Sequence, residues 1–503
     1  MVSVVRSIGL GGISGYEVSV ECYLSSGLPN FDIVGLPDTA VKEARERVRA
    51  TIKTCGYQFP ISRITVNLAP ADTRKAGTVY DLPVMLGILV SSDYIKPISA
   101  QSAFFGELSL SGELRHVSGA LPMALGAARI GIKDLFVPED NAEEAAYASD
   151  INVYPVKHVN DLILHLRGKK FINPIKPREP LPEHNPMLDF SEVKGQENVK
   201  RAMEVAAAGG HNILLSGPPG TGKSMLAKRL PSILPDMSRD EMLESTEIYS
   251  VAGLTCRNMP FIATRPFRSP HHTVSPVAVT GGTSHPKPGE ISLAHNGVLF
   301  LDEMPEFNRE VLESLRQPLE DGKVTISRAA STVTYPSRFM LICAMNPCKC
   351  GWFGHPSGRC ACSESALMKY RERLSGPLLD RIDMFIETPS LEYKELRNYS
   401  KSEPSSAIRK RVNAARMTQR QRYKSTGLKC NAHIGSKELE RFCSLSRDCE
   451  QLMRSAYTRL NMTARSYDRT LRVARTIADL AGSESIQQNY LAEAIQYRFQ
   501  GFK

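Results

Sequence analysis

The feature that most constrains this chain is a phosphate-binding loop near its middle. Residues 217–224 read Gly-Pro-Pro-Gly-Thr-Gly-Lys-Ser and match the full G-x-x-x-x-G-K-S pattern. An apolar stretch at 212–216 precedes the loop and a helical stretch at 225–230 follows it, which is the context that the pattern requires. Glycines let backbone N–H groups surround phosphates at the start of a helix. The middle of the chain is therefore predicted to bind ATP with Mg²⁺.

The loop supplies groups for both the phosphates and the metal ion. Lys223 is expected to reach the β- and γ-phosphates, and Ser224 is expected to ligate Mg²⁺. The predicted nucleotide-binding residues of the loop are Gly217, Pro218, Pro219, Gly220, Thr221, Gly222, Lys223 and Ser224.

Two further strands end in polar residues of the kind that ATP hydrolysis needs. The apolar run 298–301 is followed by Asp302 and Glu303. Asp302 is expected to hold Mg²⁺ through water, and Glu303 to polarise the attacking water. The strand 339–344 leads to Asn346, which is predicted to orient that water; the alternative is an Asx-turn asparagine before a proline. These residues predict an ATPase.

Cations that stabilise the transition state are expected farther along the chain. Arg381 lies in the segment Leu-Leu-Asp-Arg-Ile-Asp, and in a ring it would act on the ATP of the neighbouring subunit. An arginine-rich helix begins near Arg465, which is the first choice for a second phosphate sensor. Arg472 is the alternative, and a surface helix arginine remains possible for each.

Length and proline content predict an α/β multidomain chain. A chain of 503 residues is expected to form two or three domains. The expected division is an α+β domain at 1–167, a proline-rich linker at 168–187, a P-loop αβα core at 188–390 and a helical lid at 391–503. In the first segment, Asp38 is a plausible N-cap of a helix. In the last, residues 471, 474, 477 and 478 repeat apolar side chains at helical spacing.

The charge is uneven and favours a polyanionic partner. The formal net charge is +10, and the residues after about 390 account for about the whole surplus. A basic face suits a phosphate backbone, although a solvated surface has the same composition. No apolar run approaches the roughly 20 residues that span a bilayer, and the N-terminus lacks a secretory pattern. We therefore expect a cytoplasmic protein with no membrane partner.

Four of the eleven cysteines form a pattern of their own. Cys348 and Cys350 are followed at a distance of about ten residues by Cys360 and Cys362. Four thiolates satisfy tetrahedral Zn²⁺ and leave no open position, so a structural zinc site is predicted rather than a catalytic one. Reduced free thiols and a redox pair remain the alternatives.

Longer strings resemble a known family. The chain resembles the magnesium-chelatase-like AAA+ ATPases called YifB or ComM over nearly its whole length. The strings that carry the resemblance are Ile-Gly-Leu-Gly-Gly-Ile (8–13), Gly-Leu-Pro-Asp (35–38), Arg-Pro-Phe-Arg-Ser-Pro-His-His-Thr (265–273), Pro-Gly-Glu-Ile-Ser-Leu-Ala-His-Asn-Gly-Val-Leu-Phe-Leu-Asp-Glu (288–303), Ser-Gly-Pro-Leu-Leu-Asp-Arg-Ile-Asp (375–383) and Arg-Thr-Ile-Ala-Asp-Leu (475–480).

The resemblance implies a homo-oligomeric ring, expected to be a hexamer, that acts on DNA. It implies an insertion at about 250–290 and a hairpin made of 324–327 and 332–335. In the related helicases such a hairpin touches DNA, so Lys323 and Arg328 are the expected DNA contacts; a purely structural ribbon is the alternative. ComM members are similar to branch-migration helicases. A magnesium-chelatase motor and a protein-remodelling ATPase are the alternative functions.

The first domain resembles the Lon-protease-like domain of ribosomal S5 domain 2-like fold. Peptidases of that type need a serine and a lysine. The segment that matches the serine loop, Gly-Thr-Val-Tyr-Asp-Leu-Pro (77–83), contains no serine. The segment that matches the lysine helix, Ser-Gly-Ala-Leu-Pro (118–122), has proline where lysine is expected. No peptidase activity is predicted, and scaffolding or DNA contact is the expected role.

Overall fold

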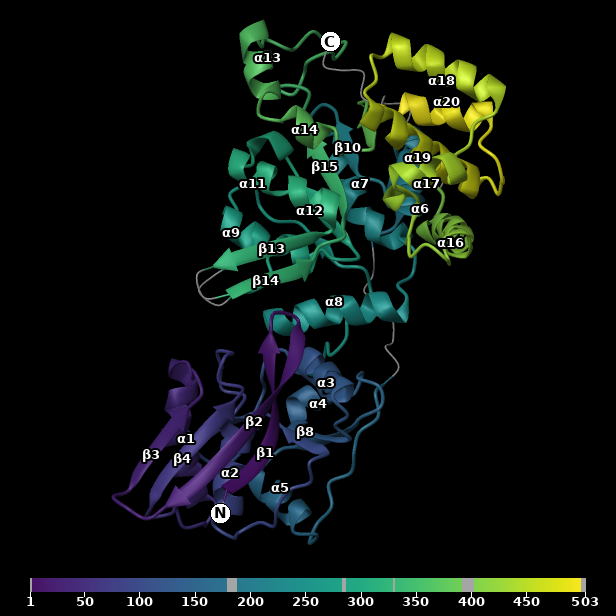
Figure 1. Ribbon diagram of the computed structural model, residues 1–503. Helices are drawn as coiled ribbons and strands as arrows, with labels where there is room; N and C mark the ends of the chain where they lie inside the picture. Colours follow the sequence, from purple (N-terminus) through teal and green to yellow (C-terminus); the bar gives the residue numbers. More distant parts are fainter. Residues whose placement is uncertain (1, 179–187, 283–285, 329–330, 391–401, 499–503) are drawn as a thin grey trace. The chain divides into compact units, whose positions relative to one another are not determined.

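The computed structural model describes residues 2–178, 188–282, 286–328, 331–390 and 402–498 (Figure 1). The chain forms two compact units. The first comprises Met1–Leu181, Arg239–Ala263 and Ala329–Tyr335, and the second comprises Pro182–Ser238, Thr264–Arg328 and Pro336–Lys503. The expected division into three domains and a linker stays a prediction, and residues 179–187 of that linker lie outside the described residues.

The first unit is built on a seven-stranded mixed sheet in the order β3-β4-β2-β1-β5-β8-β9 (Figure 1). The strands of this sheet are β1 (Val2–Gly11), β2 (Ser14–Ser25), β3 (Asn30–Val34), β4 (Arg63–Ala69), β5 (Ser102–Phe104), β8 (Asp134–Pro138) and β9 (Asn152–Val156). The short pair β6 (Glu107–Leu108) and β7 (Leu114–Arg115) is antiparallel. β1 pairs with β2 antiparallel and with β5 parallel, so it joins the two halves of the sheet.

Helices of the first unit bury their apolar faces against this sheet. They are α1 (Thr39–Thr54), α2 (Asp81–Ser91), α3 (Ala120–Arg129), α4 (Glu139–Ala145) and α5 (Val159–Leu166). The predicted cap of α1 is confirmed, because Asp38 Oδ1 accepts a hydrogen bond of 2.8 Å from the Val41 backbone N–H. α2 is buried along almost its whole length, which fits its nearly continuous apolar sequence.

A segment from the middle of the chain belongs to the first unit. Helix α8 (Arg239–Ala252) packs on α3, and the Gly119 N–H donates to the Ser250 carbonyl at 3.0 Å. The Thr255 hydroxyl donates to the buried carboxylate of Glu144 at 2.9 Å. The beginning of the expected insertion at 250–290, up to Ala263, is therefore part of the first unit.

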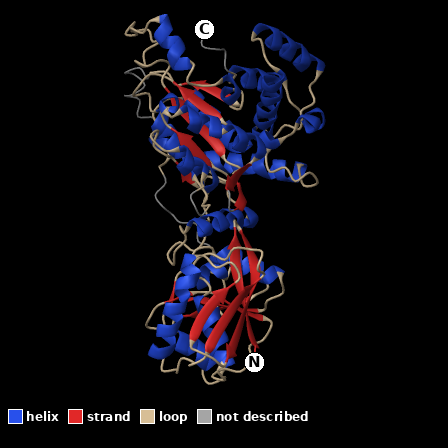
Figure 2. Cartoon of the chain, turned by 60° about the vertical axis from the view of Figure 1, so that its left-hand side comes forward, coloured by secondary structure: helices blue, strands red, loops and turns tan. Residues whose placement is uncertain are grey.

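The second unit contains a five-stranded parallel sheet in the order β11-β12-β15-β10-β16. Figure 2 shows its strands in red with helices in blue around them. The strands are β10 (Ile213–Ser216), β11 (Phe267–Arg268), β12 (Val298–Leu301), β15 (Met340–Met345) and β16 (Met384–Glu387). β10, β12 and β15 are short and apolar, and they are almost wholly buried. This is the composition expected of parallel strands covered on both faces.

Helices of the second unit surround that sheet and continue into the C-terminal region. They are α6 (Glu197–Gly209), α7 (Lys223–Arg229), α9 (Pro276–Thr280), α10 (Glu290–Leu293), α11 (Arg309–Ser314), α12 (Arg316–Asp321), α13 (Glu364–Arg371), α14 (Gly376–Leu379), α16 (Ser405–Arg422), α17 (Ser436–Phe442), α18 (Arg447–Arg459), α19 (Ala464–Leu480) and α20 (Gln488–Gln496). Single 3₁₀ turns lie at Phe190–Glu192, Leu230–Ile233, Met304–Glu306 and Asn431–His433. One hydrophobic core joins α6, the sheet and the C-terminal helices.

The C-terminal region is helical, as its apolar spacing predicts. In α19 the side chains of Leu471, Ala474, Ile477 and Ala478 are all buried. Among the described residues, no helix combines the length and the apolar composition needed to cross a membrane.

The predicted hairpin is confirmed. β13 (Lys323–Arg328) and β14 (Ser331–Pro336) form a two-stranded sheet. Lys323 is exposed at the start of β13. Arg328 ends that strand, and its side chain and the turn at 329–330 lie outside the described residues.

Candidate nucleotide-binding site

The phosphate-binding loop connects β10 to α7 and packs against the end of β16. Gly220 and Gly222 have φ angles of +81° and +85°, in the region that favours glycine. A Cβ at Gly217 would lie 2.3 Å from the carbonyl oxygen of Thr388, the residue after β16. The Thr388 hydroxyl contacts the Thr221 hydroxyl at 3.1 Å. Only glycine at 217 lets the loop approach the neighbouring strand this closely.

Sheet register brings the predicted catalytic residues to one edge. Ser216 pairs with Met345, so the loop and Asn346 leave the sheet at the same level. Leu301 pairs with Cys343 on the adjacent strand, so Asp302 lies level with Ala344, two residues before Asn346. Ligand sites of parallel sheets lie beyond the carboxyl ends of the strands. The sheet thus gathers residues that are widely separated in the sequence.

Lys223 links the loop to the third strand. Its Nζ donates to the Gly217 carbonyl at 2.6 Å, to the Pro218 carbonyl at 2.8 Å and to Asn346 Oδ1 at 3.2 Å. Burial lowers the pKa of Lys223, and the nearby carboxylates of Asp302 and Glu303 oppose this effect. Both acids therefore act on the same ammonium group that contacts Asn346.

The two acids differ in their surroundings. Asp302 is half-buried and accepts a hydrogen bond of 3.0 Å from the backbone N–H of Glu303. Glu303 is exposed and has a φ of +51°, which is uncommon for a residue other than glycine and clusters at functional sites. Ser224 is the second residue of α7 and is half-buried. Ser224 offers a hydroxyl oxygen and Asp302 carboxylate oxygens, which is the donor type that Mg²⁺ prefers.

Arg381 and Arg465 lie near the amino-terminal ends of the parallel strands, whereas the phosphate-binding loop of the same chain lies at the carboxyl ends. Arg381 precedes β16 by three residues, whereas the loop follows β10. The four residues of β10 span about 13 Å at about 3.3 Å each. Arg381 pairs with Glu320, and Arg465 lies 3.9 Å from the same carboxylate. These two arginines are brought together, but not onto the phosphate-binding loop of the same chain.

The same end of the sheet contains a cationic cavity of about 510 Å³. The arginines that line it are Arg338, Arg381, Arg465, Arg469 and Arg472. Arg469 pairs with Asp383, whose carboxylate is buried and also accepts a hydrogen bond of 2.8 Å from the Asn212 N–H. Asp383 has no predicted role, and its only sequence signal is the family string that ends at it. Arg469 lies in the arginine-rich helix that begins near Arg465, but no pattern in the sequence pairs it with Asp383.

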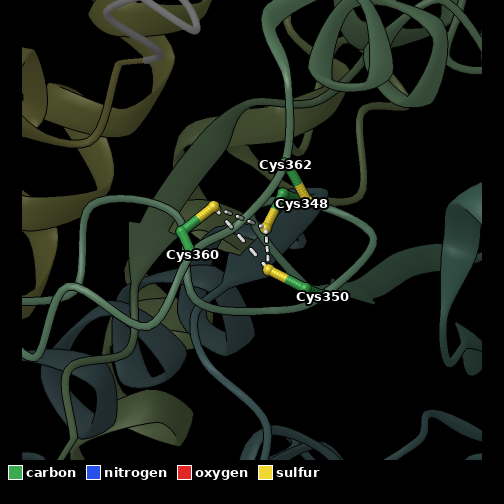
Figure 3. A group of neighbouring side chains, drawn as sticks. All are labelled: Cys348, Cys350, Cys360 and Cys362. Carbon is green, nitrogen blue, oxygen red and sulfur yellow. Dashed lines mark hydrogen bonds between the residues drawn. The ribbon is translucent and has the colours of Figure 1, made fainter.

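The four clustered cysteines are brought together, with their sulfur atoms pointing toward one another (Figure 3). Cys348 Sγ lies 3.3 Å from Cys350 Sγ and 3.8 Å from Cys360 Sγ, and Cys350 Sγ lies 3.7 Å from Cys360 Sγ. All four sulfurs lie within 4.8 Å of one another. A disulfide would need about 2.05 Å, so these are free thiols that can hold a metal ion.

Family models match three parts of the chain that together make up most of it. Residues 189–396 match the model described as magnesium chelatase, subunit ChlI. Residues 20–141 match subunit ChlI of Mg-chelatase, and residues 402–498 match its C-terminal part. The magnesium-chelatase 38 kDa subunit of Rhodobacter capsulatus is 26% identical over 184 residues, which cover 32% of this chain and 51% of that protein.

Two full-length relatives are more similar. Competence protein ComM of Haemophilus influenzae is 43% identical over 504 residues, covering 99% of this chain and 97% of that protein. YifB of Salmonella typhimurium is 41% identical over 499 residues with the same coverage of both chains. The expected resemblance is confirmed, and this chain belongs to the YifB/ComM family of magnesium-chelatase-like AAA+ proteins.

Proposed function

We propose that this chain is the subunit of an ATP-hydrolysing ring that acts on DNA, by branch migration or helicase-like translocation. The observation that carries the ATPase is the position of Lys223. Its ammonium group contacts two carbonyls of the phosphate-binding loop and the side chain of Asn346, with two carboxylates nearby. Residues that follow three separate strands thus surround one ammonium group. In the proposed ATP complex, phosphate oxygens replace the two loop carbonyls as hydrogen-bond acceptors for this group.

Each residue at this edge has a role in the proposed hydrolysis. The loop holds the phosphates, and Ser224 and Asp302 hold Mg²⁺, which neutralises charge on the transferred group. Glu303 takes the proton of the attacking water, because its side chain is exposed at the carboxyl edge. Asn346 orients that water, since its amide already faces Lys223 Nζ at 3.2 Å.

The proposed ring follows from the place of the arginines. A cation opposite the γ-phosphate is needed to stabilise the transition state. Arg381 and Arg465 gather at the edge away from their own loop, beside the cationic cavity. If a neighbouring subunit presents its nucleotide to this cavity, these arginines supply the required cation to that nucleotide, although they lie away from their own loop. The family is one of oligomeric rings, and six subunits is the proposed number.

DNA as the substrate is supported by charge and by the similarity to ComM. The basic surplus lies in the C-terminal residues, and Lys323 is exposed at the base of the hairpin. The relative with 43% identity is named a competence protein. We propose Lys323 and Arg328 as contacts to the phosphate backbone, which carry affinity but little sequence information.

We also propose that the four cysteines hold Zn²⁺. Four sulfurs at about 2.3 Å from a tetrahedral zinc ion lie about 3.8 Å from one another. Two of the observed sulfur–sulfur distances, 3.7 and 3.8 Å, match this expected distance. Zinc bound by four thiolates has no open position, so it would stabilise the loop and take no part in hydrolysis.

The function is tested by measuring ATP turnover with different effectors. We expect forked or single-stranded DNA to stimulate ATPase activity several-fold and Lys323→Ala to weaken DNA binding. That variant should also reduce the slope of log affinity against log salt by about 1. Lys228→Ala, an exposed lysine on α7 that lies outside the basic C-terminal region, is the matched control. Stimulation by unfolded protein or by a porphyrin, with no response to DNA, contradicts the DNA assignment and favours a remodelling or chelatase motor.

A further inference from the structure

The segment that contains the four cysteines joins two parts of the nucleotide site. β15 ends at Met345, Asn346 follows, and Cys348 is the second residue after it and is fully buried. At the other end, Ser363 follows Cys362 directly and caps α13, its hydroxyl accepting from the Ala366 N–H at 3.3 Å. Any ion held by the cysteines therefore lies between the predicted water-orienting residue and α13.

The cysteine segment touches the phosphate-binding loop directly. Gly351 has a φ of +84°, and a Cβ there would lie 2.6 Å from Pro219 Cδ and 3.8 Å from Asn346 Cγ. Gly351 follows the ligand Cys350 in the chain, and the backbone N–H of Phe353 donates to Cys348 Sγ at 3.3 Å. The backbone that carries the thiol cluster is therefore the same backbone that packs against the loop and against Asn346.

Helix α13 returns the other end of the segment to the same site. The Tyr370 hydroxyl donates to the Asn346 carbonyl at 3.1 Å. Just after the helix, Arg373 Nη1 donates to the Pro305 carbonyl at 3.0 Å, two residues beyond Glu303. Both ends of the cysteine segment therefore hold residues that flank the predicted catalytic groups.

The segment buries too little surface to hold this arrangement by packing. Within 347–363, only Cys348 and Gly351 are buried, and the other residues are half-exposed or exposed. A short segment with so small a core needs another source of order, and a bound metal ion supplies it by linking both ends. Without the ion, the contacts of Gly351 and Tyr370 lose the constraint that places them.

We propose that zinc binding at Cys348, Cys350, Cys360 and Cys362 is coupled to nucleotide binding, so that each ligand raises the affinity for the other. The inference rests on the proposed nucleotide site and adds a regulatory link to it. Zinc orders the backbone that presents Asn346 and Pro219, and nucleotide orders the loop on which Gly351 packs. Thermodynamic linkage requires the two effects to be equal.

The chain offers a direct probe of this coupling. Trp352 is the single tryptophan of the sequence and lies between the two pairs of cysteines. We would remove the metal with a zinc-selective chelator and titrate it back in chelator-buffered zinc with Mg²⁺ present, following Trp352 emission with and without ADP. The converse titration measures a fluorescent ADP analogue on the zinc-loaded and zinc-free protein.

We expect about one zinc per chain in the purified protein. ADP should tighten zinc binding, and zinc should tighten ADP binding by the same factor, on the order of fivefold or more. Tyr370→Phe should retain zinc but show a smaller factor, because it removes only the bond to the Asn346 carbonyl. Cys256→Ser, an exposed cysteine outside the cluster, should match the wild type.

Each contrary result has a distinct meaning. A purified protein that neither contains nor takes up zinc overturns the metal site. Zinc-loaded protein that binds ADP with an affinity equal to that of the zinc-free form overturns the coupling and leaves the ATPase proposal intact. Zinc-loaded protein that binds no nucleotide overturns the proposed function, and the coupling with it.

Discussion

Asp383 is a buried charge that holds the start of β10, and its replacement by asparagine should strongly destabilise the second unit. The side chain is 4% exposed, and it accepts from the Asn212 N–H and pairs with Arg469. The Asn212 side chain in turn donates to the Arg381 carbonyl at 3.0 Å and accepts from the Leu341 N–H at 2.8 Å. One carboxylate thus supports the strand before the phosphate-binding loop and the backbone of the proposed trans-acting arginine.

The magnitude follows from what Asp383→Asn leaves behind. Asparagine is nearly isosteric and can still accept from Asn212, so the packing is retained. The Arg469 guanidinium, which is 16% exposed, loses its counter-charge. Removing one partner of a buried ion pair costs about 3–5 kcal/mol. Because one hydrogen bond survives, we expect a loss near 3 kcal/mol, toward the lower end of that range.

Urea unfolding followed by Trp352 emission measures this loss, because Trp352 belongs to the second unit. The control is Glu403→Gln, since Glu403 and its partner Arg411 are both 43% exposed and should contribute less than about 1 kcal/mol. A loss for Asp383→Asn as small as that of the control would refute the reasoning.

The pH dependence gives a second check. Burial raises the pKa of Asp383, but Arg469 and the hydrogen bonds outweigh it and hold the pKa well below its usual value. A depressed folded pKa stabilises the fold fully above the unfolded pKa of about 4, and this contribution is lost as the pH falls further. The difference between wild type and variant should therefore be constant from pH 7 to about 5 and shrink below about pH 4. A difference that grows on acidification contradicts the assignment.

Three further substitutions test the proposed motor. Lys223→Ala should abolish ATP binding measured by calorimetry, because it removes the cation that bridges the loop and Asn346, whereas Lys228→Ala, an exposed lysine on the same helix, should bind normally. Glu303→Gln should bind ATP while its turnover falls at least about 100-fold; normal turnover removes Glu303 from its role. Arg381→Ala should keep nucleotide affinity and lose hydrolysis. Mixing it with Glu303→Gln should restore part of the activity, since one subunit then supplies the arginine and its neighbour the acid. Absence of any recovery counts against action between subunits.

Local sequence patterns determined most of the nucleotide site. The phosphate-binding loop, the acids at 302 and 303 and Asn346 all follow short apolar strands, and the carboxyl ends of parallel strands must meet at one edge. The pairing of Lys223 with Asn346 is a direct consequence of that register. The cysteine spacing likewise predicted the cluster, because only a short loop has to close between the two pairs.

The tertiary structure decided everything that depends on partners distant in the chain. The sequence alone does not predict strand β1 at Val2–Gly11, because its second half is buried without alternation and its place is set by pairing with β2 and β5. The ion pair of Asp383 with Arg469 joins residues 86 apart, so no local pattern marks it. From the sequence Arg381 is predicted to act on the ATP of a neighbouring subunit and Arg465 to be a second phosphate sensor, and only the tertiary structure placed both beside Glu320, away from their own loop. The physical reason is that hydrogen-bond periodicity and turn chemistry act between near neighbours, whereas burial and charge pairing depend on which distant segments the fold brings together.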